Sequence, residues 1–238
     1  MKKQILNTDS YSPLYKQLMQ QLRSDIQNGV YPVHSRIPSE QELCDTYQVS
    51  RVTVRKALAE LTQEGLLNRH QGKGTFVGVP RIRKDLRDVN SFHDICRVMG
   101  SVPTTRLLHV QWVYPEETDA RELNCEPGEQ VLEIVRLRLA DDIPVMLETN
   151  RFPADYGWLS ETDLTGSLYA LLAEKGVEAK QAVHDISLCH ATPAQAKALA
   201  VEPGEALLCL QEAIFDQNGH PLHTSHQVIR GDRFTFRI

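Results

Sequence analysis

The chain has 238 residues, 41% of them apolar and 24% charged, which is long enough for two modest domains that each bury a core. No apolar run reaches the length of a membrane span, and the N-terminal MKKQILNTDS lacks the apolar core of a secretory signal, so we expect a cytoplasmic protein with no membrane partner. The five cysteines are scattered and never form a CxxC pair, which favours reduced thiols over disulfides or a zinc site.

Charge is divided unevenly along the chain. Residues 1–88 hold 14 Lys+Arg and 9 Asp+Glu, whereas residues 89–238 hold 12 and 22. This asymmetry predicts a part that binds a polyanion, joined to an acidic body.

Three helices are predicted in the first part of the chain. Residues 10–28 carry leucine or isoleucine at every fourth position and end at a glycine, which predicts a helix. Two shorter helices follow in PSEQELCDTYQVSRVTVR, residues 38–55. Ser39 caps the first of these and Glu42 completes a capping box, and Ser50 caps the second.

The last of these helices has an apolar and a polar side. Its predicted buried positions recur at helical spacing: Val52, Ala57, Leu58 and Leu61. Its predicted exposed positions are Arg51, Thr53, Arg55 and Lys56. A basic helix end projecting from a short helix pair is the geometry that enters a DNA major groove. Taken alone, the same residues also fit an ordinary helical hairpin with a solvated face.

A basic hairpin is predicted next. Residues 66–70 and 75–77 read as two strands, and Gln71-Gly72-Lys73-Gly74 forms the tip between them. Three helices followed by such a hairpin predict a winged helix-turn-helix. The glycines allow the tip to approach a phosphate backbone or a minor groove closely.

Residues 10–78 resemble the DNA-binding domain of the GntR family of bacterial transcription regulators. The matching stretches are LYKQLMQQLRSDIQNG, RIPSEQELCDTYQVSRVTVRKALAELTQEGLL and RHQGKGTFV. The resemblance implies a homodimer that binds a pseudo-palindromic operator in double-stranded DNA. The DNA-contacting residues that it implies are Ser39, Gln41, Ser50, Arg51, Thr53 and Arg55 in the helix pair, with Gln71, Gly72, Lys73 and Gly74 in the wing.

Gln41 departs from the pattern of this family, in which many members carry an arginine that reads guanine. Glutamine pairs naturally with adenine. Either the preferred operator differs at this position, or the position does not read bases.

The predicted domain boundaries are a winged helix-turn-helix over residues 1–78, a linker over 79–90, and an effector-binding and dimerisation domain over 91–238. The linker holds three arginines and a lysine. It is either a solvated connection or an additional phosphate contact.

The second domain contains an internal repeat of a helix, an EPGE turn and a hairpin. The two EPGE motifs begin at Glu126 and Glu202, and Pro144 and Pro221 lie at matching places in the two hairpins, at almost the same offset. A repeated hairpin unit predicts one antiparallel sheet with pseudo-two-fold symmetry and helices packed against it. The whole chain is therefore expected to be α+β.

Arg136 and Arg138 lie two residues apart on a predicted strand and so share one face. One interpretation is a solvated charge ladder with Glu133, Glu148 or Asp142. The other is a site for a small anion, since guanidinium groups suit phosphate and carboxylate. In the second case Glu148 on the partner strand would accept hydrogen bonds from the ligand.

Residues 89–238 resemble the effector-binding UTRA domain of the HutC subfamily, which shares the chorismate lyase-like fold. The stretches that carry the resemblance are VNSFHDICRVMG, VRLRLADDIPVMLE, GSLYALL and VIRGDRFTF, and the nearest pattern is that of regulators responding to N-acetylglucosamine 6-phosphate. It implies that a phosphate is held by Arg136, Arg138, Ser167, Tyr169 and the helix starting at Ser91, Phe92 and His93, with Glu148 on the sugar. Ile229 stands where the amino-sugar regulators have an aromatic hydroxyl, so a phosphorylated sugar derivative fits as well as an amino sugar.

The predicted function is a DNA-binding repressor that a small phosphorylated sugar or sugar derivative releases from its operator. The alternatives are a regulator that responds to a non-phosphorylated carboxylate, a lyase-like enzyme, and a DNA-organising protein without an effector. The nine histidines follow no catalytic or metal-binding spacing, so no enzyme activity, cofactor or metal is predicted.

Overall fold

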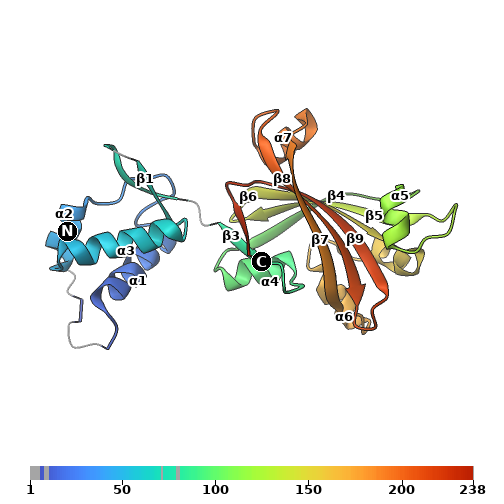
Figure 1. Ribbon diagram of the computed structural model, residues 1–238, viewed down its shortest axis with the longest axis horizontal. Helices are drawn as coiled ribbons and strands as arrows, with labels where there is room; N and C mark the ends of the chain where they lie inside the picture. Colours follow the sequence, from blue (N-terminus) through green and yellow to red (C-terminus); the bar gives the residue numbers. More distant parts are fainter. Residues whose placement is uncertain (1–5, 8–10, 71, 79–80, 238) are drawn as a thin grey trace. The chain divides into compact units, whose positions relative to one another are not determined.

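The computed structural model describes residues 6–7, 11–70, 72–78 and 81–237. The chain forms two compact units, Met1–Arg81 and Ile82–Ile238, and each contains both helices and strands (Figure 1). The predicted α+β class is confirmed. None of the helices in these ranges is long and apolar enough to cross a membrane.

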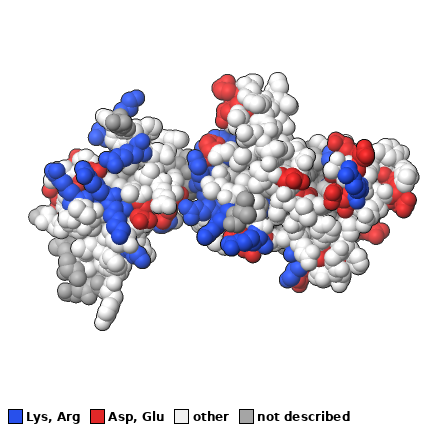
Figure 2. All heavy atoms as spheres, in the orientation of Figure 1, with Lys and Arg blue, Asp and Glu red and all other residues white. Residues whose placement is uncertain are grey.

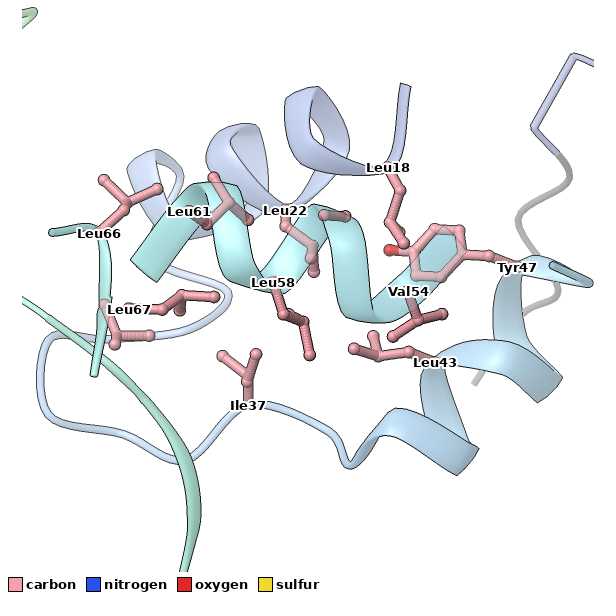
Figure 3. Close-up of a cluster of buried hydrophobic side chains, with 12 residues drawn as sticks. Leu18, Leu22, Ile37, Leu43, Tyr47, Val54, Leu58, Leu61, Leu66 and Leu67 are labelled. Carbon is pink, nitrogen blue, oxygen red and sulfur yellow. The ribbon is translucent and has the colours of Figure 1, made fainter. Parts of the chain in front are cut away.

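The N-terminal unit consists of three helices and a hairpin. Their bounds are α1 Leu14–Gln27, α2 Glu40–Tyr47, α3 Arg51–Gln63, β1 Leu67–His70 and β2 Gly74–Val77. As predicted, Ser39 and Glu42 form a capping box at α2, and Ser50 caps α3. Leucines of all three helices pack into one core with Ile37, Val54 and Tyr47 (Figure 3). These elements form the predicted winged helix-turn-helix.

The predicted burial of Val52 is wrong. Its side chain is 77% exposed, while the buried stripe of α3 consists of Val54, Ala57, Leu58 and Leu61. Successive helical residues are about 100° apart, so Val52 lies roughly opposite Val54 around the helix. An apolar side chain therefore projects beside Arg51 at the exposed end of α3.

The C-terminal unit is built on a six-stranded antiparallel sheet in the order β4-β5-β6-β9-β8-β7. The strands are β4 Pro103–Val113, β5 Val131–Ala140, β6 Ile143–Phe152, β7 Ala179–His190, β8 Ala206–Asp216 and β9 Pro221–Ile229. The predicted single sheet with pseudo-two-fold symmetry is confirmed, because β4-β5-β6 and β7-β8-β9 form equivalent halves that meet at β6 and β9. Thr149 pairs with His226, its counterpart in the second repeat, and the axis passes between them.

Helices cover both faces of this sheet. On the first face, α4 (Phe92–Val98), α6 (Leu168–Glu174) and the short helix η1 (Ala154–Glu161) pack on apolar side chains of β5, β6, β8 and β9. On the second face, α7 (Pro193–Leu199) packs on Leu137, Leu139 and Val228. There α5 (Glu117–Glu122) is attached by an ion pair of 2.6 Å between Asp119 and Arg151.

The segment predicted as a linker over residues 79–90 includes a strand of the C-terminal unit. Ile82–Asp85 forms β3, which pairs in parallel with β10, Phe234–Arg237. The buried Ile82 and Phe234 join the core beneath α4. The sequence hides this strand because β3 is short and its partner is the last strand of the chain, far away in sequence.

Candidate DNA-binding face and ligand pocket

The exposed end of α3 carries the residues expected to contact DNA. Arg51 and Arg55 are exposed, and Thr53 is half-buried beside the cap residue Ser50, with 2.9 Å between their hydroxyl oxygens. Glu40 at the start of α2 joins this helix to the wing. One of its oxygens accepts a hydrogen bond from Arg55 at 2.8 Å, and the other accepts one from Arg69 of β1 at 3.1 Å.

Gln41 contacts Arg51 directly. Its Oε1 accepts a hydrogen bond of 2.6 Å from Nη2 of Arg51, while its Nε2 donates to Asp45 at 2.9 Å. An arginine at this position could not accept the bond from Arg51, because a guanidinium group only donates. Gln41 thus orients an arginine of α3, whether or not it also reads a base.

The wing tip has the predicted backbone geometry. Gly72 and Gly74 have φ angles of +75° and +117°, which side chains disfavour. A Cβ atom at Gly74 would lie 2.7 Å from Nε of Arg36. Lys73 is exposed between the two glycines, and Gln71 lies outside the described residues. Glu40, Arg36 and Arg69 were missed by the sequence analysis, although Arg69 stands in the RHQGKG stretch.

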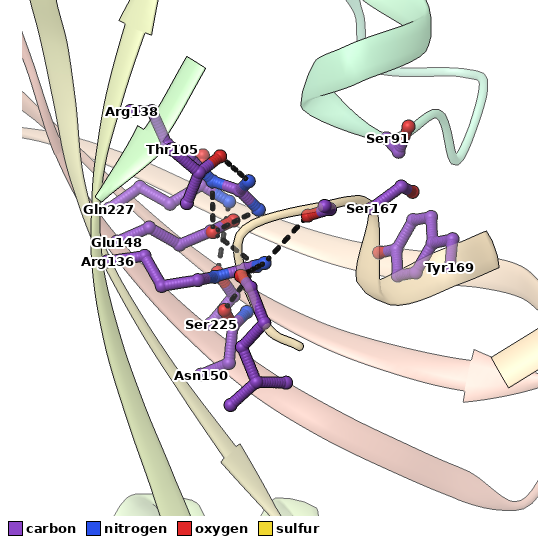
Figure 4. A network of polar contacts seen from close by, with 12 residues as sticks. Ser91, Thr105, Arg136, Arg138, Glu148, Asn150, Ser167, Tyr169, Ser225 and Gln227 are labelled. Atoms are coloured by element: carbon purple, nitrogen blue, oxygen red, sulfur yellow. Dashed lines mark hydrogen bonds and ion pairs between the residues drawn. The ribbon is translucent and has the colours of Figure 1, made fainter. Parts of the chain in front are cut away.

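The first face of the C-terminal sheet holds a polar pocket (Figure 4). Arg136 and Arg138 are 1% and 3% exposed, and both donate to the same oxygen, Oε2 of Glu148, at 2.7 and 2.8 Å. Arg136 also donates to Asn150, and Arg138 to Thr105. The predicted solvated charge ladder is therefore wrong. Glu148 does pair with both arginines, but all three side chains are buried.

Charge in the pocket is only partly balanced. Its walls carry three cations, Lys84, Arg136 and Arg138, against two carboxylates, Glu148 and Glu212. Burial raises the pKa of Glu148, but the arginines outweigh this and hold it at about 2. Among the described residues, Nε of Arg136 has no hydrogen-bond partner. A buried cation surplus with an unused donor favours an anionic ligand.

Two helix starts face these arginines across the pocket (Figure 4). Ser91 caps α4 and Ser167 caps α6, so each hydroxyl already accepts a backbone N–H of its own helix. The ring of Phe92 lies 5.5 Å from the guanidinium carbon of Arg138. Among the described residues, the pocket walls include Ser91, Phe92 and Tyr169 but not His93 or Ser167.

Burial, followed by the charges of Arg138 and Arg136, lowers the pKa of His93. The shift is consistent with a ring close to the arginines although it is outside the pocket walls. The predicted phosphate-holding residues thus lie on the first face of the sheet and on the helices that cover it, with the two serines serving as helix caps.

Three polar residues of β9 that were not predicted from the sequence also line the pocket: His223, Ser225 and Gln227. Their alternation along the strand was a usable signal, because every second residue shares a face. His223 is buried, and its Nε2 lies 3.3 Å from the hydroxyl of Tyr169. Burial lowers the pKa of His223 to about 4, so the imidazole is neutral near pH 7.

A second missed group joins the pocket to β3. Nζ of Lys84 lies 2.6 Å from Oε1 of Glu212, which occupies the place of Arg136 in the second repeat. The same oxygen lies 2.8 Å from Nδ1 of His184, and Nε2 of His184 is 3.0 Å from the carbonyl of Leu86. Two contacts thus hold the segment around β3 against β7 and β8.

The cavity among these residues is small. Its volume is about 40 Å³, whereas pockets for small molecules usually hold ~300–1,000 Å³. A ligand larger than a few water molecules therefore needs an outward movement of α4, α6 or the β3–β10 pair, the elements that cover the sheet.

Each of the two units matches a known protein family. Residues 14–77 match the family described as bacterial regulatory proteins, gntR family, and residues 98–235 match the UTRA domain. The transcriptional repressor NagR of Bacillus subtilis is 34% identical over 233 residues, covering 97% of this chain and 96% of that protein. A probable fructoselysine utilization operon transcriptional repressor of Escherichia coli is also 34% identical, with 97% of each chain covered.

Among solved structures, PhnF from Mycobacterium smegmatis superposes with a TM-score of 0.85 at 28% identity, covering 94% of this chain and 97% of that one. The family and the two relatives from Bacillus subtilis and Escherichia coli are transcription regulators and not enzymes, which removes the lyase alternative. The chain belongs to the GntR family of bacterial regulators, as a DNA-binding regulator of the HutC type with a UTRA effector domain.

Proposed function

We propose that this regulator is a cytoplasmic, homodimeric repressor that leaves its operator when a phosphorylated sugar or sugar derivative enters the pocket of the C-terminal unit. The observation that carries the proposal is the buried group of Arg136, Arg138 and Glu148. Two arginines share one carboxylate there, and a phosphate dianion would supply the missing negative charge. The relative named for a fructoselysine operon is consistent with a sugar-derived effector.

The pocket also accounts for release. A cavity of about 40 Å³ must open to admit a sugar phosphate, and two of its covering elements, β3 and α4, directly follow the N-terminal unit in the chain. Opening would displace that segment and with it the DNA-binding unit. An effector can weaken DNA binding only by as much as it prefers the opened state.

The homodimer is supported by apolar side chains along the two edge strands. On β7, Val183, Ile186 and Leu188 are 59%, 42% and 74% exposed. On β4, Leu107, Leu108 and Trp112 are at least 40% exposed. Such edges favour association with a second copy, and a dimer matches an operator with two half-sites.

The proposal is tested by a thermal-shift screen with matched pairs of compounds, each sugar or sugar–amine conjugate with and without its phosphate. We expect stabilisation by phosphorylated members only. Arg138→Lys, which keeps the charge but loses the planar fork, should lose most of the shift, whereas Arg121→Lys on the exposed face of α5 should keep it. Equal shifts from phosphorylated and unphosphorylated partners would refute a phosphate-reading pocket and favour the carboxylate alternative.

A further inference from the structure

The acidic C-terminal unit carries a basic surface at one end. Its 15 Lys+Arg and 24 Asp+Glu are spread unequally: residues 82–97 and 230–237 hold seven of the cations and four of the anions, and five of these cations are not buried. Figure 2 shows Lys and Arg side chains gathered over β3, β10 and α4, whereas Asp and Glu dominate around α5. Sequence position alone does not reveal this surface, because the fold joins segments far apart in the chain.

Strand pairing between β3 and β10 puts Arg83 and Arg237 on one outer face. In the β3–β10 register, Arg83 lies opposite Thr235 and Arg237 lies opposite Asp85, and the alternate residues point into the core. Arg87 follows β3 and pairs with Asp85 at 2.6 Å. We define the exposed Arg83, Arg87 and Arg237 as the β3–β10 basic face. Asp85 lies on this face, and the exposed Asp88 follows Arg87 and acts on it electrostatically. Three arginines against these two carboxylates leave the face positive by one charge.

Arg97 extends the positive surface from the last turn of α4, which packs against β3. The pKa of Asp85 is held low chiefly by its hydrogen bonds with Arg87, with Arg237 adding a smaller effect. Asp85 is therefore ionised and already engaged at neutral pH. The face has no further carboxylate among its β3 and β10 positions, which leaves Arg83 and Arg237 to meet an external anion.

The position of the face in the chain limits how far it can be from bound DNA. Val77 ends the wing strand β2 and Ile82 begins β3, so five residue steps separate them. An extended chain of that length spans at most about 18 Å, however the two units are arranged. A polyanion bound by the wing is thus present at high effective concentration around β3.

We propose that the β3–β10 basic face contacts the phosphate backbone of DNA flanking the sequence read by the winged helix. The contact supplies affinity without sequence information, because guanidinium groups on phosphates read charge and not bases. It also joins the two functions: Arg83 lies beside Lys84, which reaches into the pocket from the opposite side of the same strand. The proposal rests on DNA binding and is independent of the effector's identity.

The test compares two double variants that remove the same charge from the C-terminal unit. Arg83→Ala with Arg237→Ala removes the face, and Arg121→Ala with Lys197→Ala removes exposed cations on α5 and α7. Operator affinity is measured by fluorescence anisotropy over a range of salt concentrations. The slope of log K against log salt is negative, and each lost phosphate contact reduces its magnitude by about 0.9. The face variant should therefore have a slope smaller in magnitude by about 2 per bound protomer.

Three further results are expected from the same experiment. The control variant keeps the wild-type slope, the face variant weakens operator and unrelated DNA by the same factor, and shortening the operator flanks weakens the wild type but not the face variant. An unchanged slope in the face variant overturns the proposal. So does an equal loss in both variants, which would indicate a general charge effect, or a loss of affinity accompanied by a lower melting temperature without a change in slope.

Discussion

At the scale of single residues, Glu148 binds the two arginines that the proposed anionic ligand would need. Its Oε2 accepts from Arg136 and Arg138, so a ligand phosphate must compete with an internal carboxylate. Such competition would raise the concentration of effector needed to occupy the pocket. Removing one member of a buried charge group also destabilises the fold, by ~3–5 kcal/mol in other proteins.

Replacing Glu148 by glutamine separates these effects. The variant should melt earlier than the wild type but gain a larger thermal shift from inorganic phosphate, because a second uncompensated guanidinium is then available. Inorganic phosphate has no sugar hydroxyl, so the measurement isolates the competition. A smaller phosphate shift in Glu148→Gln than in the wild type would mean that Glu148 does not compete with the anion.

His223 predicts a dependence of stability on pH. Its pKa in the folded protein is about 4, below the ordinary value of 6.5, because burial disfavours the charged ring. The unfolded chain therefore binds the proton more tightly, and the contribution of His223 is present above pH 6.5 and is lost as pH falls towards 4. The loss between pH 7.5 and 5 is about 2 kcal/mol.

Urea unfolding at a series of pH values measures this effect. The free energy of unfolding of His223→Gln should fall less steeply with acid than that of the wild type, by about 2 kcal/mol over this range. His220→Gln, which alters an exposed histidine in the preceding turn, serves as the control. Parallel pH curves for His223→Gln and the wild type would contradict the assignment.

At the scale of elements, the segment around β3 joins the pocket to the rest of the chain. Lys84 pairs with Glu212 in the pocket wall, and His184 lies within hydrogen-bond distance of the carbonyl of Leu86. These contacts hold β3 in the closed arrangement. An outward movement of β3 that opened the pocket would break both contacts.

Lys84→Met removes the first contact while keeping the length of the side chain. Because Lys84 is also one of the three pocket cations, effector binding should weaken. At saturating effector, the ratio of operator affinities without and with effector should fall towards one, since allosteric coupling is typically worth ~5–150-fold. Lys180→Met on the exposed side of β7 is the matched control. If Lys84→Met keeps the full ratio, β3 does not transmit the state of the pocket.

The sequence predicts elements whose signal is local and misses those whose partner is distant. The capping box at Ser39, the repeat and the shared face of Arg136 and Arg138 follow from spacing alone. The strand β3 does not, because so short a strand is defined by its pairing with β10. Val52 shows a different limit: β-branched residues two positions apart on a helix look alike in sequence, but only Val54 is in phase with the buried stripe.

For the ligand pocket, the arginines were visible because two adjacent cations on a strand need an explanation. Glu212 was not, because a single charge on a strand usually faces solvent, and Lys84 was not, because it lies in a charged stretch that was predicted to be a linker. Their burial depends on which strands neighbour one another in space. The alternation of His223, Ser225 and Gln227 predicts that they share one face of a strand. It does not predict a pocket, because a solvent-exposed polar face has the same pattern.

At the scale of the whole molecule, the edge strands predict association between two copies. Leu188 on β7 is 74% exposed, so Leu188→Lys should yield a monomer by sedimentation and lose most of the affinity for a two-half-site operator. Binding to a single half-site should change little. Val98→Lys, at an exposed position outside both edge strands, is the control, and an intact dimer in Leu188→Lys would exclude this edge from the interface.

The central claim is that a phosphate-bearing ligand on Arg136 and Arg138 releases the DNA. The most direct test is operator binding, followed by fluorescence anisotropy, during titration with a compound that stabilises the wild type in the thermal-shift screen. We predict that the wild type dissociates from the operator, that Arg138→Lys binds the operator normally but is not released, and that the unphosphorylated compound has no effect. Release of both proteins at the same concentration would contradict the claim.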